Sequence, residues 1–239
     1  MTTTSTEKPG VRTGYAALPA LMARMTGDEK HSMAASSTVD VLWVLYDQIL
    51  DVTPDRLNDP DRDRFLLSKG HGPTGFYAVL AAKGFIEPDL LNNWASKESP
   101  LGRHPDRTLV PGAEIGSGSL GHGLPIAIGV ALGLRAEGRT KPKVVVLVGD
   151  GELDEGSNFE AIAVAGRLGL TQLTVVAIDN ASSSHGWPGG IARRFEVEGW
   201  ASTTVDGRDH AQLAAAFRTP HPGRPAVVVA TMQRKAATA

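Results

Sequence analysis

The chain has 239 residues, of which 41% are hydrophobic and 21% are charged, so it can bury one large core. Its 24 Lys and Arg and 26 Asp and Glu nearly balance, which disfavours nucleic-acid binding because no excess of positive charge faces the phosphates. The sequence contains no cysteine, which excludes a disulfide framework and cysteine-bound zinc and fits the cytoplasm. The longest apolar stretch, residues 124–134, is about half of the roughly 20 residues that a membrane span needs, so no membrane segment is expected.

Residues 1–10 are polar, and we expect a disordered tail there, followed by a single domain over residues 11–239. Three apolar, β-branched runs are typical of strands buried on both faces of a parallel sheet, and helical patterns alternate with them. This alternation predicts an α/β fold, a doubly wound and mostly parallel sheet with helices on both faces. In chain order, the predicted elements are a helix over 39–50, a strand over 64–68, helices over 75–83 and 88–95, a strand over 143–148, a helix over 159–168, strands over 173–178 and 201–205, a helix over 210–217 and a strand over 225–231.

Two of the predicted strands end in polar residues. Gly149, Asp150 and Gly151 follow one strand, and Asn180 follows the next. Ligands of open parallel sheets bind beyond the carboxyl ends of the strands, so Asp150 and Asn180 are expected to face one crevice. Mg²⁺ bound to a diphosphate can take one carboxylate, one amide oxygen and a main-chain carbonyl as its protein ligands. The phosphate can approach the backbone closely at the two glycines, and the N-terminus of the next helix attracts its negative charge. The alternative is a tight turn that caps a helix.

A glycine-rich run over residues 116–123 precedes a helical stretch. Gly116, Gly118 and Gly121 match the dinucleotide fingerprint, but no good strand precedes them and no acidic strand end follows about 20 residues later. A backbone cradle for a phosphate or a ring is one interpretation. A helix cap with close packing is the other.

Histidines and glutamates supply candidate acid–base groups. His71 and His104 lie in glycine-containing turns, where an imidazole suits proton transfer or anion contact, or is an ordinary surface residue. Glu155 and Glu160 either share a proton or act as first-turn acids that complement a helix dipole. The pattern His-Glu-x-x-His is absent, so a zinc hydrolase has no support. The remaining candidates are expected at the surface: His185, His210 and His221.

Several motifs occur together, in the following order: His31 before a Ser-rich helix start, Asp63–Gly72, Gly102–Pro105, Gly118–Gly123, Gly149–Gly156, Asp179–Asn180 and Asp206–His210. This set resembles the N-terminal, thiamine-diphosphate-binding half of transketolase, and in particular the separate N-terminal subunit of enzymes split over two chains. The resemblance covers roughly residues 31–229. Several independent motifs in one order are far more specific than any single one.

The resemblance implies a metal and a cofactor. Asp150, Asn180 and the main-chain carbonyl of Ser182 would hold Mg²⁺, which bridges the two phosphates of thiamine diphosphate. The positions implied to contact the cofactor are His71, Gly118, Ser119, Leu120, Gly149, Asp150, Gly151, Glu152, Asn180 and Ser182.

The resemblance also implies catalytic groups. His31, His71 and His104 would face the sugar hydroxyls and act in substrate binding and proton transfer. Glu155 and Glu160 match two acids that form a proton wire between paired active sites. The implied reaction transfers a two-carbon ketol unit from a ketose or ketose phosphate to an aldehyde, with the cofactor as electron sink.

Three departures from the family pattern matter. Residues 181–185 are polar, whereas the family has apolar residues after its metal-binding asparagine. A glycine-rich loop and a further active-site histidine after the last strand have no counterpart. Nothing in the sequence matches the pyrimidine-binding domain, so we expect activity only with a C-terminal partner subunit, most simply as two copies of each.

Two other functions stay open at this point. One is a 2-oxoacid dehydrogenase-like or acyl-transfer subunit that delivers a two-carbon unit to a lipoyl or carrier-protein thiol, since such proteins share the diphosphate motif. The other is a non-catalytic subunit that binds the cofactor or stabilises a partner.

Overall fold

The computed structural model describes residues 13–26 and 35–232. Its five strands form one parallel sheet in the order β1-β2-β3-β5-β4. Each predicted strand is confirmed, with both ends within one residue of the prediction. The strands are β1 (Arg64–Leu67), β2 (Val144–Gly149), β3 (Leu173–Asp179), β4 (Ala201–Asp206) and β5 (Ala226–Thr231).

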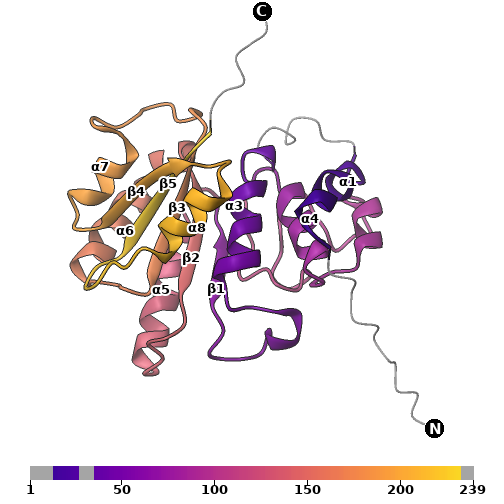
Figure 1. Ribbon diagram of the computed structural model, residues 1–239, viewed down its shortest axis with the longest axis horizontal. Coiled ribbons are helices and arrows are strands. Elements are labelled where there is room, and N and C mark those ends of the chain that lie inside the picture. The colour runs from indigo at the N-terminus through magenta and orange to yellow at the C-terminus, as the bar shows by residue number, and fades with distance from the viewer. Residues whose placement is uncertain (1–12, 27–34, 233–239) are drawn as a thin grey trace, which may run out of the picture.

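Helices cover both faces of this sheet (Figure 1). Successive side chains of a buried strand point to opposite faces, and β2 shows it clearly. Val145 and Leu147 pack in a core with α3, α4 and α8, whereas Val146 and Val148 pack with α5, α6 and α7. The predicted doubly wound α/β fold is therefore confirmed. The helices are α1 (Leu18–Ala23), α3 (Val39–Val44), α4 (Thr74–Ala82), α5 (Gly123–Ala136), α6 (Gly156–Arg167), α7 (Gly190–Glu196) and α8 (His210–Arg218).

Two predicted helices differ from the structure in kind. The segment expected as a helix over 88–95 is a 3₁₀ helix, η5 (Pro88–Asn93), because Leu91 is its one buried residue and no apolar stripe supports an α-helix. The helix expected over 39–50 is α3 followed by a π-helical turn, η3 (Leu45–Ile49). Helices α1 and α7 were not predicted, since six or seven residues carry too little periodicity.

Asp40 of α3 joins the N-terminal helices to the far end of the sheet. Its carboxylate is 6% exposed and accepts a hydrogen bond from the Tyr15 hydroxyl at 2.5 Å. His210 Nε2, at the start of α8, lies 2.9 Å from the same oxygen, and Arg208 lies 3.7 Å from the other. Burial and the nearby Asp40 raise the pKa of Tyr15 to about 12. The expectation that His210 is an ordinary surface residue is therefore wrong, since it joins α8 to α3 on the same face of the sheet.

Replacing Asp40 with asparagine is expected to lower the free energy of unfolding by about 2 kcal/mol, because two hydrogen bonds to a buried charged group are weakened. Urea unfolding followed by circular dichroism measures this change. Asp89→Asn is a matched control, because the Asp89 side chain is 94% exposed. Equal stabilities of the two variants would contradict the assignment of Asp40 as an anchor.

The predicted tail over residues 1–10 lies outside the described residues. The single-domain assignment over residues 11–239 stays a prediction. In the part of the chain that the structure describes, none of the helices is long and apolar enough to cross a bilayer.

Candidate functional site

Asp150 is held rigidly at the carboxyl end of β2. It is 2% exposed, and its Oδ1 accepts a hydrogen bond from the Gly151 amide at 2.8 Å. The Ser182 amide donates to Oδ2 at 2.7 Å, and the Ser182 hydroxyl also donates to the carboxylate. The loop after β3 is therefore tied to the residue that follows β2, as expected for neighbouring parallel strands. Oδ2 keeps a lone pair for a further partner.

Asn180 supplies an oxygen that lacks a partner. Its Oδ1 is buried and forms no hydrogen bond with any described residue, a state that costs free energy unless a ligand satisfies it. The next residue, Ala181, takes a left-handed backbone conformation with φ +57°, a strained arrangement that clusters at functional sites. The Ser182 carbonyl then lies over Gly151, 3.4 Å from the position that a Cβ there would occupy.

These oxygens fit Mg²⁺. A buried carboxylate, an unpartnered amide oxygen and a main-chain carbonyl are the neutral and anionic hard donors that this ion takes alongside phosphate and water. Within the described ranges, no group of three or more His, Cys, Asp or Glu side chains is arranged to hold a metal ion. A metal at this position therefore depends on one carboxylate and neutral oxygens, the donor set that the sequence predicts.

The absence of a side chain at Gly149 makes room for Lys69. A Cβ at Gly149 would lie 3.2 Å from Cδ of Lys69, and the predicted contact of Gly149 with a phosphate stays a prediction. Lys69 is 8% exposed, and burial lowers its pKa to about 8, against the opposing charges of Asp150 and Glu152. The site thus contains a buried ammonium group that the sequence analysis did not single out.

The turns that carry His71 and His104 lie next to the glycine-rich turn at Gly118. The rings of His71 and His104 lie 5.5 Å apart and nearly perpendicular. A Cβ on Gly118, which has φ +123°, would lie 3.0 Å from the His104 ring, and a Cβ on Gly70 would lie 2.8 Å from the Gly118 amide. Only glycine allows this approach of three segments. Ser119 is exposed and Leu120 half-buried beside them.

The third predicted histidine, His31, lies outside the described residues. Its predicted role beside His71 and His104 stays a prediction.

Glu152 faces the interior. It is 2% exposed, and its carboxylate accepts hydrogen bonds from Ser68, Gly121 and Gly149. Burial raises its pKa, against these bonds and the charge of Lys69. The carboxylate predicted to contact a cofactor is therefore engaged with the protein itself.

Glu155 and Glu160 lie on the outside of α6. The helix begins at Gly156, so Glu155 is its N-cap, without a side-chain capping bond, and Glu160 lies beyond the first turn. The alternative that both are first-turn acids is wrong. Both side chains are exposed. A 3₁₀ helix, η6 (Gly151–Asp154), directly follows Asp150, so the predicted α-helical N-terminus is not next to the Gly151 turn.

Asp154, which the sequence analysis did not single out, fixes the polar residues 183–185. Asp154 accepts hydrogen bonds from the Ser183 hydroxyl at 3.0 Å and from the Ser184 and His185 amides at 3.0 and 3.4 Å. Although partial burial opposes it, these bonds lower the pKa of Asp154. Trp187 then packs on Phe159 of α6, with ring centroids 4.6 Å apart. No local pattern links positions about 30 residues apart, so this contact had no signal in the sequence.

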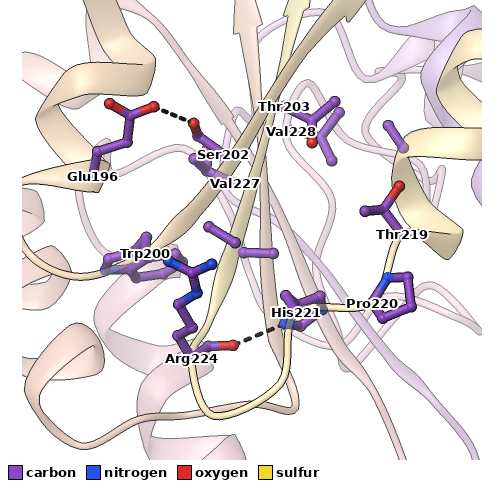
Figure 2. A pocket seen from close by; sticks show the side chains of 13 residues that line it. Glu196, Trp200, Ser202, Thr203, Thr219, Pro220, His221, Arg224, Val227 and Val228 are labelled. Carbon is purple, nitrogen blue, oxygen red and sulfur yellow. Dashed lines mark hydrogen bonds between the residues drawn. The ribbon is translucent and has the colours of Figure 1, made fainter.

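A cavity of about 450 Å³ lies at the opposite edge of the sheet, where β4 and β5 begin. Figure 2 shows Ser202 bonded to Glu196 and His221 bonded to the Arg224 carbonyl around it. The cavity contains none of the predicted site residues. The residues at the carboxyl ends of β2 and β3 remain the candidate site.

Comparison with known families decides the relationship. Residues 22–233 match the family model described as "Transketolase, thiamine diphosphate binding domain". The chain belongs to the transketolase family. The predicted resemblance to the thiamine-diphosphate-binding part of a transketolase is thereby confirmed.

Individual relatives of this transketolase-family chain carry different names. It is 36% identical over 213 residues to one subunit of an apulose-4-phosphate transketolase from Actinobacillus succinogenes, covering 86% of this chain and 77% of that protein. It is 60% identical over 223 residues to a protein named "Ferredoxin fas2" from Rhodococcoides fascians, covering 93% of this chain and 73% of that protein.

A solved structure agrees with the family assignment. A mutant transketolase from Pichia stipitis superimposes with a TM-score of 0.78 and 25% identity over 90% of this chain. The chain spans about a third of that transketolase, 35% of its length.

Proposed function

We propose that the chain is the N-terminal subunit of a heteromeric, thiamine diphosphate- and Mg²⁺-dependent enzyme of the transketolase type. It transfers a two-carbon ketol unit from a ketose or ketose phosphate donor. The observation that carries this proposal is the buried, unpartnered Asn180 Oδ1 beside the fixed carboxylate of Asp150. This arrangement, in a chain of a thiamine-diphosphate-binding family, is what a Mg²⁺–diphosphate group requires.

Asp150, Asn180 and the Ser182 carbonyl would hold the metal. Gly151 leaves the backbone open toward that carbonyl, and the turn over residues 118–120 would line the cofactor. When bound, thiamine diphosphate supplies the electron sink that makes cleavage of a carbon–carbon bond next to a carbonyl possible.

His71 and His104 would bind the sugar. Both rings carry nitrogen atoms that can donate hydrogen bonds to sugar hydroxyls or accept hydrogen bonds from them. Their perpendicular arrangement lets each ring present a nitrogen to a different hydroxyl. His31 completes the set in the prediction. A site that pairs with hydroxyls discriminates against a donor without them, because such a donor forms fewer hydrogen bonds in the site.

The rest of the enzyme would come from a C-terminal subunit that carries the pyrimidine-binding domain. Two exposed apolar side chains would lie in its interface: Val164 of α6 and Leu168, the C-cap of that helix, are 44% and 42% exposed. Residues four positions apart share one side of a helix, and exposed apolar groups of this kind are typical of interaction sites. Glu155 is the N-cap of α6 and Glu160 lies on that helix, and both are exposed, which suits their predicted role in linking paired active sites.

Two other functions receive less support. The comparisons do not support a carrier protein as the acceptor. A ferredoxin holds its cluster with cysteine thiolates, and this sequence has none, so we do not propose electron transfer despite the name of one relative. The cytoplasmic location of this chain stays a prediction.

The donor distinguishes the transketolase reaction from 2-oxoacid chemistry. We expect the assembled complex to consume a ketose phosphate, and to consume pyruvate at least about 100-fold more slowly, because histidines positioned for hydroxyls discriminate strongly against a donor that lacks them. Parallel assays with each donor, with and without an aldehyde acceptor, measure this. Consumption of pyruvate with the ketose untouched would contradict the proposal and favour the 2-oxoacid alternative.

A further inference from the structure

Glu152 lies where three segments of the site meet. Its Oε1 accepts a hydrogen bond from the Gly121 amide at 3.0 Å and another from the Ser68 hydroxyl, and its Oε2 accepts one from the Gly149 amide at 3.2 Å. Ser68 follows β1, Gly121 belongs to the glycine-rich turn, and Gly149 ends β2. One buried side chain therefore connects the loops that would surround the cofactor.

The glycine-rich turn is fixed from both sides. The Ser68 hydroxyl, which donates to Glu152, also accepts a hydrogen bond from the Gly123 amide at 3.0 Å. Ser68 therefore connects Glu152 to the end of the glycine-rich turn. Across the turn, the Ser157 hydroxyl donates to the Gly121 carbonyl at 2.7 Å. A Cβ on Gly121 would come within 2.6 Å of Glu155 and Ser157 atoms, and one on Gly123 within 2.2 Å of Ser68. The turn is therefore packed closely against the residues after β1 and against the start of α6.

The bonds around Glu152 require a group that only accepts. Two of its partners are backbone N–H groups. The third is the Ser68 hydroxyl, which already accepts a bond from Gly123 and therefore directs its own hydrogen at the carboxylate. An amide in place of the carboxylate would direct an NH₂ group at one of these donors, whichever way it rotates. The change from Glu to Gln is therefore disruptive here although the shape is kept.

We propose that Glu152 is a positioning residue that holds the turn over residues 118–120 and the turn at Gly149–Asp150 in register, and that it does not itself contact the cofactor. This proposal rests on the proposed function, because those turns are the ones expected to line thiamine diphosphate. It gives Glu152 a different role from the direct cofactor contact that the sequence resemblance implies.

Glu152→Gln in the assembled complex tests the proposal. We expect the affinity for thiamine diphosphate, measured by titration calorimetry, to fall about 10- to 100-fold, the range seen when a group that orients a ligand's direct contacts is lost. At saturating cofactor, kcat should stay within about threefold of the wild type. In the cofactor-free complex, amide hydrogen exchange of residues 116–124 should become faster. Glu98→Gln, an exposed residue, is the control and should change none of these quantities.

A double mutant separates positioning from direct contact. If Glu152 acts through Ser68 and the turn, Glu152→Gln and Ser68→Ala should each raise the cofactor Kd, and the double mutant should be no worse than the stronger single one. Additive losses, with unchanged exchange of the turn, would overturn the proposal and restore a direct contact. If Glu152→Gln does not fold, Ser68→Ala alone provides the same affinity and exchange measurements. A wild-type complex that binds no thiamine diphosphate would refute the proposed function, and the exchange measurement would still test the positioning role.

Discussion

The Asp150→Ala variant is expected to lose magnesium-dependent binding of thiamine diphosphate, with the affinity falling by more than about 100-fold. Asp150 is the one carboxylate in the proposed set of three metal ligands, so its removal leaves only neutral protein oxygens facing a divalent cation. Its bonds to Gly151 and Ser182 are lost as well, so the loop after β3 would no longer be tied to β2.

Calorimetric titration of the assembled complex, at several Mg²⁺ concentrations, measures this loss. Asp89→Ala is the matched control because Asp89 carries the same charge on an exposed position. The variant should remain folded, and circular dichroism of the complex checks this. A folded variant with unchanged cofactor affinity would show that the metal assignment is wrong.

The isolated chain is expected to show no turnover above background. In the proposed function, this chain would bind the diphosphate of thiamine diphosphate and the partner subunit would bind its aminopyrimidine, so one chain alone would hold the cofactor at one end only. Adding a C-terminal transketolase subunit should restore the rate, with a sharp dependence on the ratio of the two chains.

Size-exclusion chromatography of the mixture should show the two chains together, most simply as two copies of each. Val164→Asp, on the exposed apolar surface of α6, should weaken this association because it places a charge in the proposed interface. Turnover by the single chain at a rate comparable to that of the mixture would refute the need for a partner.

Much of the fold follows from local pattern. The strands of this sheet are buried on both faces and separated by helices, and each of these features has a short-range signature in the sequence. The pairing of Asp150 with the segment after Asn180 also follows, because neighbouring parallel strands bring their carboxyl ends together.

The finer features of the site depend on contacts between distant residues. Nothing in the local sequence indicates that the stem of Lys69 packs against Gly149. The family resemblance implies a cofactor contact for Glu152, yet its partners Ser68 and Gly121 lie 84 and 31 positions away. Asp154 orders residues 183–185 through similarly distant bonds. Periodicity and motif spacing describe neighbours in sequence, so they cannot report such bonds.

The segment Asp206–His210 is among the motifs that mark the family, yet its contacts are architectural. Asp209 caps α8 by accepting hydrogen bonds from the Ala211 and Gln212 amides, and His210 and Arg208 reach Asp40 on the neighbouring helix α3. A family signature is therefore a mixture of residues that build the scaffold and residues that face the crevice. A chain that had lost Asp150 or Asn180 would still score well on the scaffold portion, so membership of the family and competence in its chemistry have to be judged on different residues.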